Sequence, residues 1–163
     1  MKRFLLVISL LCCLSLATAQ REYTLLVSMD GFRWDYSLMY RTPFLDSLSQ
    51  VGVYAQMRPS FPSKTFPNHY TICTGLVPDH HGIIANKFYH RERGVWFSLN
   101  DPATKFDGSF YGGEPIWITA KKQGKKTAVI YWPGSDTEIH GFRPDYYHKY
   151  VKGELLTYQQ RLN

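Results

Sequence analysis

The chain has 163 residues, of which 44% are hydrophobic, 16% aromatic and 20% charged, and its formal net charge is +6. This is the composition of a globular protein. No block of like charges is present, so the composition gives no reason to expect a nucleic-acid scaffold as partner. The modest positive charge suits an anionic small molecule.

The first 19 residues have the organisation of an export signal. Lys2 and Arg3 form a charged start, residues 4–16 are apolar, and Ala17-Thr18-Ala19 matches an A-x-A cleavage site. Because the apolar run is too short to span a bilayer, we expect no retained transmembrane anchor. We therefore expect residues 1–19 to be a signal peptide, a mature chain that starts near Gln20, and a periplasmic or extracellular location.

Cys73 is the only cysteine outside this signal, so residues 20–163 hold no internal disulfide. The nearby His69 allows a thiol nucleophile as one interpretation. Cys73 lies among Ile72 and Leu76 within a predicted helix, however, which favours a buried core position.

Apolar runs and helix signals alternate through the first part of the mature chain. Residues 24–29 are mostly apolar and precede Asp30, which predicts a buried parallel strand that delivers a carboxylate at its carboxyl end. A helix is predicted from Thr42 to about Gly52, and the alternating residues 53–57 predict the next strand. In open α/β sheets, ligand sites form at the carboxyl ends of strands.

The next helix is predicted to begin near Thr65. Pro67 suits its first turn, and Gly75 and Pro78 end it. The Thr65 hydroxyl would lie where backbone N–H groups are unpaired and an oxyanion can bind, with Lys64 beside it. An ordinary threonine N-cap would give the same pattern, so this stretch alone leaves both interpretations open.

The remaining elements are predicted with less regular spacing. Residues 87–114 are polar and aromatic and are interpreted as irregular. A helix follows from Pro115 to Gly124, with proline at its start and glycine at its end. Residues 127–132 then predict a strand, and residues 154–162 a final helix.

Five stretches occur in one order along the chain: S-M-D-G-F-R (28–33), F-P-S-K-T-F-P-N-H-Y (61–70), T-G-L-V-P-D-H-H-G-I-I-A-N (74–86), G-G-E-P-I-W-I-T-A (112–120) and Y-W-P-G-S-D (131–136). Together they resemble the nucleotide pyrophosphatase/phosphodiesterase family of the alkaline phosphatase superfamily. The resemblance implies an α/β fold with a mixed, mostly parallel sheet sandwiched by helices, incomplete in this chain. It also implies that residues 20–163 are the N-terminal portion of a single phosphodiesterase catalytic domain, truncated at its C-terminus and inactive alone.

The resemblance implies hydrolysis of phosphodiester or pyrophosphate bonds in nucleotides, with two Zn²⁺ per intact active site. Asp30 and Thr65 would bind one Zn²⁺, while the family's remaining Asp and His ligands lie downstream of residue 163. Thr65 would attack phosphorus and form a covalent threonyl-nucleotide intermediate, because metal coordination activates its otherwise too basic hydroxyl. The amide of Asn86 would contact a phosphate oxygen.

Three further residues are implied to bind the substrate. A nucleobase would stack between Phe66 and Tyr150, an interaction worth ~1–3 kcal/mol per base. Lys105 would meet the nucleotide, although its alignment crosses loops of variable length. Tyr146 and Tyr147 are interpreted as loop aromatics that cover the core.

Some motifs suggest other sites or functions. His81 is interpreted as structural, and the D-x-x-x-H spacing of Asp136 and His140 is rejected as a metal pair because the family's D-x-x-G-H motif lies downstream. Two alternative functions stay open: a phosphodiesterase for lipid head groups of the choline-phosphate type, and a non-catalytic nucleotide-binding fragment.

Overall fold

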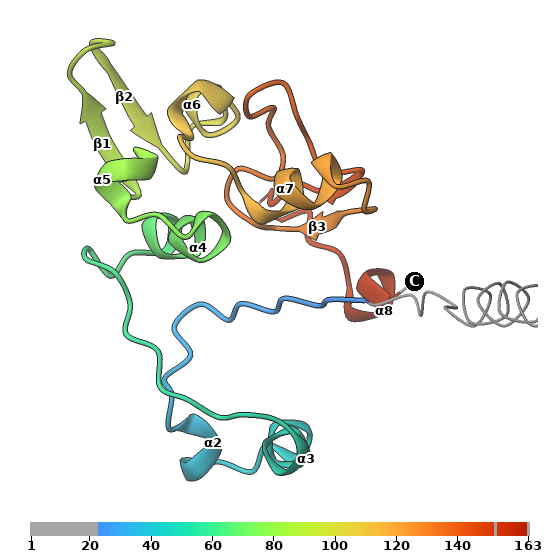
Figure 1. Ribbon diagram of the computed structural model, residues 1–163. Coiled ribbons are helices and arrows are strands. Elements are labelled where there is room, and N and C mark those ends of the chain that lie inside the picture. The colour runs from blue at the N-terminus through green and yellow to red at the C-terminus, as the bar shows by residue number, and fades with distance from the viewer. Residues whose placement is uncertain (1–22, 152, 163) are drawn as a thin grey trace, which may run out of the picture.

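A computed structural model describes residues 23–151 and 153–162 (Figure 1). Its helices are α2 (Tyr36–Met39), α3 (Pro43–Val51), α4 (Thr65–Thr74), α5 (Pro78–His81), α6 (Pro102–Lys105), α7 (Ile116–Lys122) and α8 (Tyr158–Leu162), with a 3₁₀ turn η1 (Gly108–Phe110). Its strands are β1 (Lys87–His90), β2 (Val95–Ser98), β3 (Ala128–Ile130) and β4 (Tyr146–His148). In Figure 1, α2 and α3 lie apart from the other helices and from the strands, joined to them by two extended segments.

The described strands form two small sheets. β1 and β2 pair antiparallel, with Phe88 opposite Phe97, and Gly94 at φ 66° helps to reverse the chain between them. β3 and β4 pair parallel, with Ala128 opposite Tyr146. The parallel pair brings the carboxyl ends of two strands to one edge, where α/β folds place ligands.

An aromatic core holds α4 against the β1–β2 hairpin and α7. The ring of Tyr70 lies edge-on to the rings of His81 and Tyr111, at centroid distances of 5.0 and 5.2 Å. Edge-to-face pairs of this kind stabilise a core beyond the area they bury. The buried hydrophobic residues of this core are Phe66, Tyr70, Cys73, Ile83, Phe88, Phe97, Phe110, Tyr111, Trp117, Ile118 and Ile139.

Local sequence signals placed several elements correctly. The predicted helices over 42–52 and from Thr65 are present as α3 and α4, and Gly75 ends α4 at φ 70°. The predicted helix after Pro115 is α7, and Gly124 follows it at φ 74°. Each depends on caps and periodicity within a few residues, which is the information that a single sequence carries.

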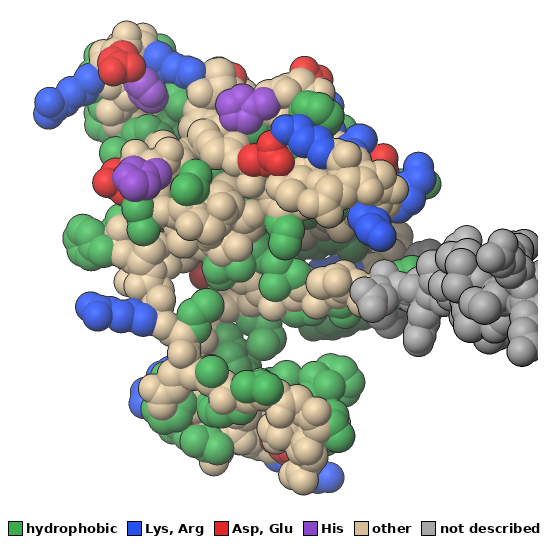
Figure 2. All heavy atoms as spheres, viewed as in Figure 1, with side chains coloured by type: hydrophobic (Ala, Val, Ile, Leu, Met, Phe, Trp, Pro, Cys, Tyr) green, Lys and Arg blue, Asp and Glu red, His purple; other side chains and the backbone are tan. Residues whose placement is uncertain are grey.

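The two strands predicted over 24–29 and 53–57 are not formed. Both segments are extended, but their side chains are exposed, with Leu25 at 88% and Val53 at 98%. A strand needs a neighbour to supply ladder hydrogen bonds, and no described segment lies in register beside them. Figure 2 shows hydrophobic side chains on the visible surface over α2 and α3, the part of the molecule that adjoins these segments.

Other predictions also need correction. The β1–β2 hairpin lies within 87–114, which was expected to be irregular, and α8 is shorter than the predicted 154–162 helix. Tyr146 and Tyr147 do not cover the core: they lie on β4 and are exposed. The carbonyl of Thr127 accepts the N–H of Tyr146 at 3.0 Å, so pairing with β3 orients this segment.

The expected signal peptide over 1–19 lies outside the described residues. Across 23–151 and 153–162, no helix combines the length and the apolar character needed to cross a bilayer.

His81 is a buried structural histidine at the end of α5. Its Nδ1 accepts the backbone N–H of Ile83 at 3.2 Å, so the ring proton sits on Nε2, 3.0 Å from the hydroxyl oxygen of Thr71. Burial lowers the pKa of His81 below its usual 6.5. The imidazole is therefore neutral in the folded chain at neutral pH.

We expect the free energy of unfolding to fall more steeply below pH 6.5 in the native chain than in a His81→Asn variant. Because the pKa of His81 is lowered in the folded chain, below pH 6.5 the unfolded chain binds a proton at this residue more readily than the folded chain does. This contribution is present above the unfolded pKa and is lost as pH falls through the folded pKa. Urea unfolding at about pH 7.5 and about pH 5.5 measures the difference. His80→Asn, at the exposed neighbour, should keep the native pH dependence; equal pH dependence in all three proteins would contradict the assignment.

Candidate active site

Thr65 is the first residue of α4, and its hydroxyl does not cap the helix. Lys64 is the N-cap residue, with extended φ −113° and ψ 155°, and no side chain caps this end. The Thr65 hydroxyl instead donates to Oδ2 of Asp30 at 3.1 Å. The ordinary N-cap interpretation of Thr65 is therefore wrong, and its hydroxyl and the Asp30 carboxylate form a pair at the positive end of the helix.

Asp30 reaches this position through a sharp turn at the end of the extended segment 23–29. Gly31 adopts φ 68°, a backbone conformation that glycine tolerates without strain. The carboxylate stays largely exposed, and its Oδ1 lies 3.7 Å from Nε2 of His69. The Asp30 side chain thus stands at the edge of α4, open to solvent and within reach of two α4 side chains.

Sequence reasoning missed the role of His69 beside Asp30, because it considered this histidine only as a partner of Cys73. The Nδ1 atom of His69 lies 2.8 Å from the Ser28 hydroxyl oxygen, and its carbonyl accepts the indole N–H of Trp132 at 2.8 Å. The four-residue spacing from Thr65 to His69, which places both on one helix face, is the signal that could have found it. Cys73 itself is buried, and burial raises the pKa of its thiol, as expected of a core cysteine.

Asn86 joins the same helix end from the loop before β1. Its Oδ1 accepts the backbone N–H of Phe66 at 3.0 Å, which satisfies one of the unpaired donors in the first turn of α4. With the oxygen engaged there, the amide nitrogen is the end of the side chain that remains to donate to a ligand. The structure therefore brings Asn86, Asp30 and Thr65 together around the start of α4.

A cavity of about 600 Å³ lies between the extended segment and α4. Its polar lining includes Asp30, Lys64 and His69, and its apolar lining includes Met29 and Ile72. The cavity gives the start of α4 a concave surface that carries both signs of charge. Among the described residues, no group of three His, Cys, Asp or Glu side chains is arranged to hold a metal ion.

The predicted substrate-binding residues do not all meet. Phe66 is buried in the core, where its ring centroid lies 6.3 Å from that of Phe97. Lys105 and Tyr150, 45 residues apart, are in contact: Nζ of Lys105 donates to the Tyr150 carbonyl at 2.6 Å and lies 5.5 Å from the centroid of its ring. Lys105 and Tyr150 are thus in contact with each other, whereas Phe66 packs separately in the aromatic core.

Lys105 is almost fully buried, and burial lowers the pKa of its ammonium group. Asp136 is buried nearby, and burial raises the pKa of its carboxyl while the charge of Lys105 opposes that rise. The Asp136 Oδ1 atom has no hydrogen-bond partner among the described residues. The opposite charges of Lys105 and Asp136 thus favour each other's charged form inside the protein.

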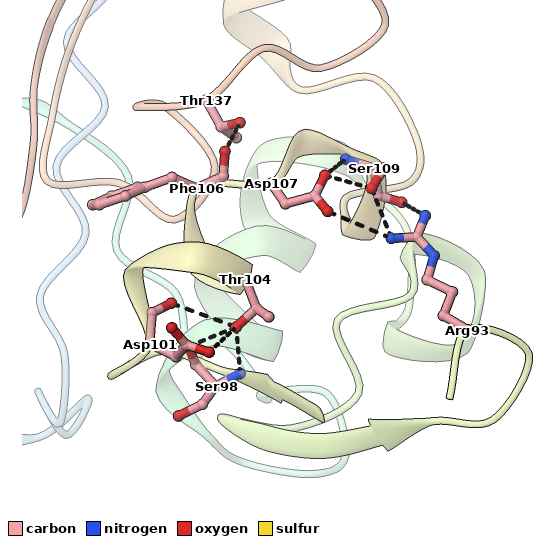
Figure 3. Close-up of polar contacts among 8 residues, drawn as sticks. All are labelled: Arg93, Ser98, Asp101, Thr104, Phe106, Asp107, Ser109 and Thr137. Carbon is pink, nitrogen blue, oxygen red and sulfur yellow. Dashed lines mark hydrogen bonds and ion pairs between the residues drawn. The ribbon is translucent and has the colours of Figure 1, made fainter. Parts of the chain in front are cut away.

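Short capped turns fix the loop that carries Lys105 (Figure 3). The Asp101 carboxylate accepts the N–H of Ala103 at 3.0 Å at the start of α6. The Asp107 carboxylate accepts the N–H of Ser109 at 2.9 Å at the start of η1. Further hydrogen bonds complete the set, from the Thr137 hydroxyl to the Phe106 carbonyl, from the guanidinium of Arg93 to the Ser109 carbonyl, and from the N–H of Ser98 to the Thr104 hydroxyl oxygen. These local bonds hold the backbone on both sides of Lys105.

The fold and site together describe an α/β protein with a hydroxyl–carboxylate pair at a helix N-terminus, the place where such folds bind phosphoryl groups. The sequence profile of the type I phosphodiesterase/nucleotide pyrophosphatase family matches residues 24–163. The chain belongs to this family.

Individual relatives agree with this assignment. Human ectonucleotide pyrophosphatase/phosphodiesterase family member 1 is 50% identical over 130 residues, which are 78% of this chain and 14% of that protein. Human family member 5 is 39% identical over 167 residues, which are 98% of this chain and 34% of that protein. This chain therefore spans between about one seventh and one third of the length of these relatives.

Solved structures confirm the predicted fold class. Murine ectonucleotide pyrophosphatase/phosphodiesterase 5, as an inactive variant in complex with AMP, superposes with a TM-score of 0.78 at 36% identity, over 87% of this chain and 38% of that one. The human member 5 structure gives the same TM-score of 0.78 at 38% identity. The alkaline phosphatase-like α/β architecture is thus present in the part of the domain that this chain covers.

Proposed function

We propose that the protein hydrolyses phosphodiester or pyrophosphate bonds in nucleotides, with Thr65 as the nucleophile. The observation that carries the proposal is the 3.1 Å contact between the Thr65 hydroxyl and the Asp30 carboxylate at the start of α4. The names of the relatives, ectonucleotide pyrophosphatases/phosphodiesterases, support the reaction class.

Asp30 and Thr65 fit a metal site as two of its ligands. Carboxylate and hydroxyl oxygens can both bind Zn²⁺, and the exposed Asp30 carboxylate is accessible to an ion. We propose that these residues hold one of two Zn²⁺ in the intact site, with the other ligands outside the described residues. A bound zinc ion supplies a Lewis acid that lowers the pKa of the Thr65 hydroxyl and neutralises phosphoryl charge.

The chain's own residues then have distinct tasks. Oγ1 of Thr65, with its proton lost to solvent, would attack phosphorus and form an O–P bond as the bond from phosphorus to the leaving group breaks and the leaving group takes up a proton. Water would then attack the covalent threonyl-nucleotide, so that a new O–P bond forms, the Oγ1–P bond breaks and the Thr65 hydroxyl regains its proton. Asn86 is suited to donate from its amide nitrogen to a phosphoryl oxygen, because its Oδ1 is held by the Phe66 N–H. The positive end of the α4 dipole favours the same negative charge.

For the nucleoside part, we propose a subsite around Lys105 and Tyr150. The Tyr150 ring is 46% exposed and can stack on a base, whereas the buried Phe66 ring offers only a small contact surface. The AMP bound to the murine member 5 structure supports a nucleotide as substrate.

We propose further that residues 1–19 are a signal peptide, that 20–163 form the N-terminal portion of one catalytic domain, and that the protein acts in the periplasm or outside the cell.

Hydrolysis of paired nitrophenyl esters tests this function. In the intact protein that carries this chain, we expect nitrophenyl-thymidine phosphate to be cleaved with a kcat/KM about tenfold or more above that of nitrophenyl-phosphocholine, because only the first offers a base to stack. A chelator should abolish both activities and added Zn²⁺ should restore them. A preference for the phosphocholine ester would favour a lipid head-group phosphodiesterase, and tight nucleotide binding without turnover in zinc would favour a binding-only protein.

A further inference from the structure

Tyr131 holds a strained backbone conformation next to the proposed base subsite. It follows β3 directly, and its φ is 61°, in the left-handed region that bulky side chains rarely adopt. Non-glycine residues persist in this region when the surrounding structure over-determines them, and they concentrate at functional sites. The contacts of Tyr131 therefore indicate what this conformation serves.

The backbone of Tyr131 extends the parallel ladder by one hydrogen bond. Its N–H donates to the His148 carbonyl at 3.1 Å, just beyond the register pair of Ile130 and His148. The phenol oxygen accepts the N–H of Leu156 at 2.5 Å. Tyr131 is therefore held at both ends, by the neighbouring strand and by the chain that follows Tyr150.

Between these two anchors, the Tyr131 ring meets two rings of the segment that contains β4. Its centroid lies 5.5 Å from that of His148, at an interplanar angle of 86°, and 5.8 Å from that of Tyr150, at 89°. Both are edge-to-face contacts, which aromatic rings prefer. The guanidinium carbon of Arg161 lies 5.3 Å from the Tyr131 ring centroid and adds a cation–π contact.

Tyr150 has two kinds of restraint. Its backbone is held through the carbonyl that accepts from Lys105, and its ring contacts Lys105 Nζ and Tyr131 while remaining about half exposed. A point charge beside a ring does little to fix the ring plane, whereas a perpendicular ring that is anchored through its backbone restricts that plane.

We propose that Tyr131 is a positioning residue that fixes the plane of the Tyr150 ring for stacking on a planar aromatic base. The proposal rests on the proposed function, in which Tyr150 receives the base. The left-handed backbone at Tyr131 then has a specific purpose: the turn of the chain after β3 aims the phenol ring at Tyr150, two residues beyond the end of β4. Tyr131 sets base affinity through Tyr150 and leaves the phosphoryl end of the site unaffected.

Calorimetric binding of AMP and of ribose 5-phosphate to the intact protein tests this role. The ratio of the two affinities isolates the base, because ribose 5-phosphate lacks it. In Tyr131→Leu we expect this ratio to fall by about fivefold or more, the effect of a weakened stack, with ribose 5-phosphate affinity unchanged. Tyr131→Phe keeps the ring and is expected to rescue the ratio. Tyr146→Leu, an exposed tyrosine on β4, is the matched control and should keep it.

Each other result has a definite meaning. If Tyr131→Leu keeps the AMP preference, or loses affinity for both ligands equally, the positioning role is wrong while the base subsite stands. If the native protein binds AMP no better than ribose 5-phosphate, the base subsite of the proposed function fails, and the role of Tyr131 fails with it.

Discussion

Thr65→Ala is expected to lower the turnover of a nucleotide diester by on the order of a thousandfold or more, since loss of the proposed covalent nucleophile would remove the reaction path itself. The Thr65 hydroxyl donates only to the Asp30 carboxylate among the contacts of the described chain, so its removal disturbs no helix cap. We therefore expect AMP affinity and the urea midpoint to stay near native values. Measuring kcat with a nitrophenyl nucleotide ester, at saturating zinc, gives the size of the effect.

Thr74→Ala provides the matched control for this experiment. Thr74 is the last residue of the same helix, and its hydroxyl donates to the Tyr70 carbonyl at 2.7 Å. Its loss should leave kcat within about twofold, because the two hydrogen bonds it removes, to Tyr70 and from Leu76, lie far from the helix start. Substantial turnover by Thr65→Ala would show that another group attacks phosphorus, and would remove Thr65 from the mechanism.

Phe97→Ala is expected to reduce the free energy of unfolding by about 3–5 kcal/mol, the range for truncating a buried phenylalanine. The Phe97 side chain is 0% exposed, and its ring contacts four others in the core, those of Phe66, Phe88, Phe110 and Tyr111. The cavity left by the change would separate the β1–β2 hairpin from α4. Urea unfolding at neutral pH measures the loss.

The neighbouring Trp96 supplies the comparison for Phe97. It alternates to the other face of β2 and is 57% exposed, although its ring contacts Tyr89 and Lys87. Trp96→Ala should cost about 1 kcal/mol or less, because surface contacts of this kind contribute little. Equal losses for the two variants would mean that the hairpin does not pack on α4 as described.

The sequence predicted those features that depend on neighbouring residues. α3, α4 and α7 follow from local periodicity and end signals, and Gly75 and Gly124 lie where the pattern put them. The family resemblance, carried by five ordered stretches, predicted the fold class that the solved relatives confirm. These features need no knowledge of which distant segments meet.

What the sequence did not predict depends on distant contacts. A strand over 24–29 needs a partner that local pattern cannot supply, and the contact between Lys105 and Tyr150 spans 45 residues. The proximity of His69 to Asp30, which lies 39 residues earlier in the sequence, depends on the fold and could not be predicted from local pattern. The left-handed backbone of Tyr131 is set by the strand and rings around it, and tyrosine at that position gives no local sign of it.

The reactivity of the buried Cys73 thiol reports local opening of helix α4. Its sulfur lies inside α4, donates to the Tyr70 carbonyl at 3.3 Å, and is the one free thiol in the described residues. Because a thiol reagent reacts with exposed thiolate, and burial raises the pKa of this thiol, labelling must wait for the helix to detach from its core. The labelling rate therefore measures how often the helix that carries Thr65 opens. A nucleotide that binds at the start of this helix would lower the labelling rate without contacting the sulfur.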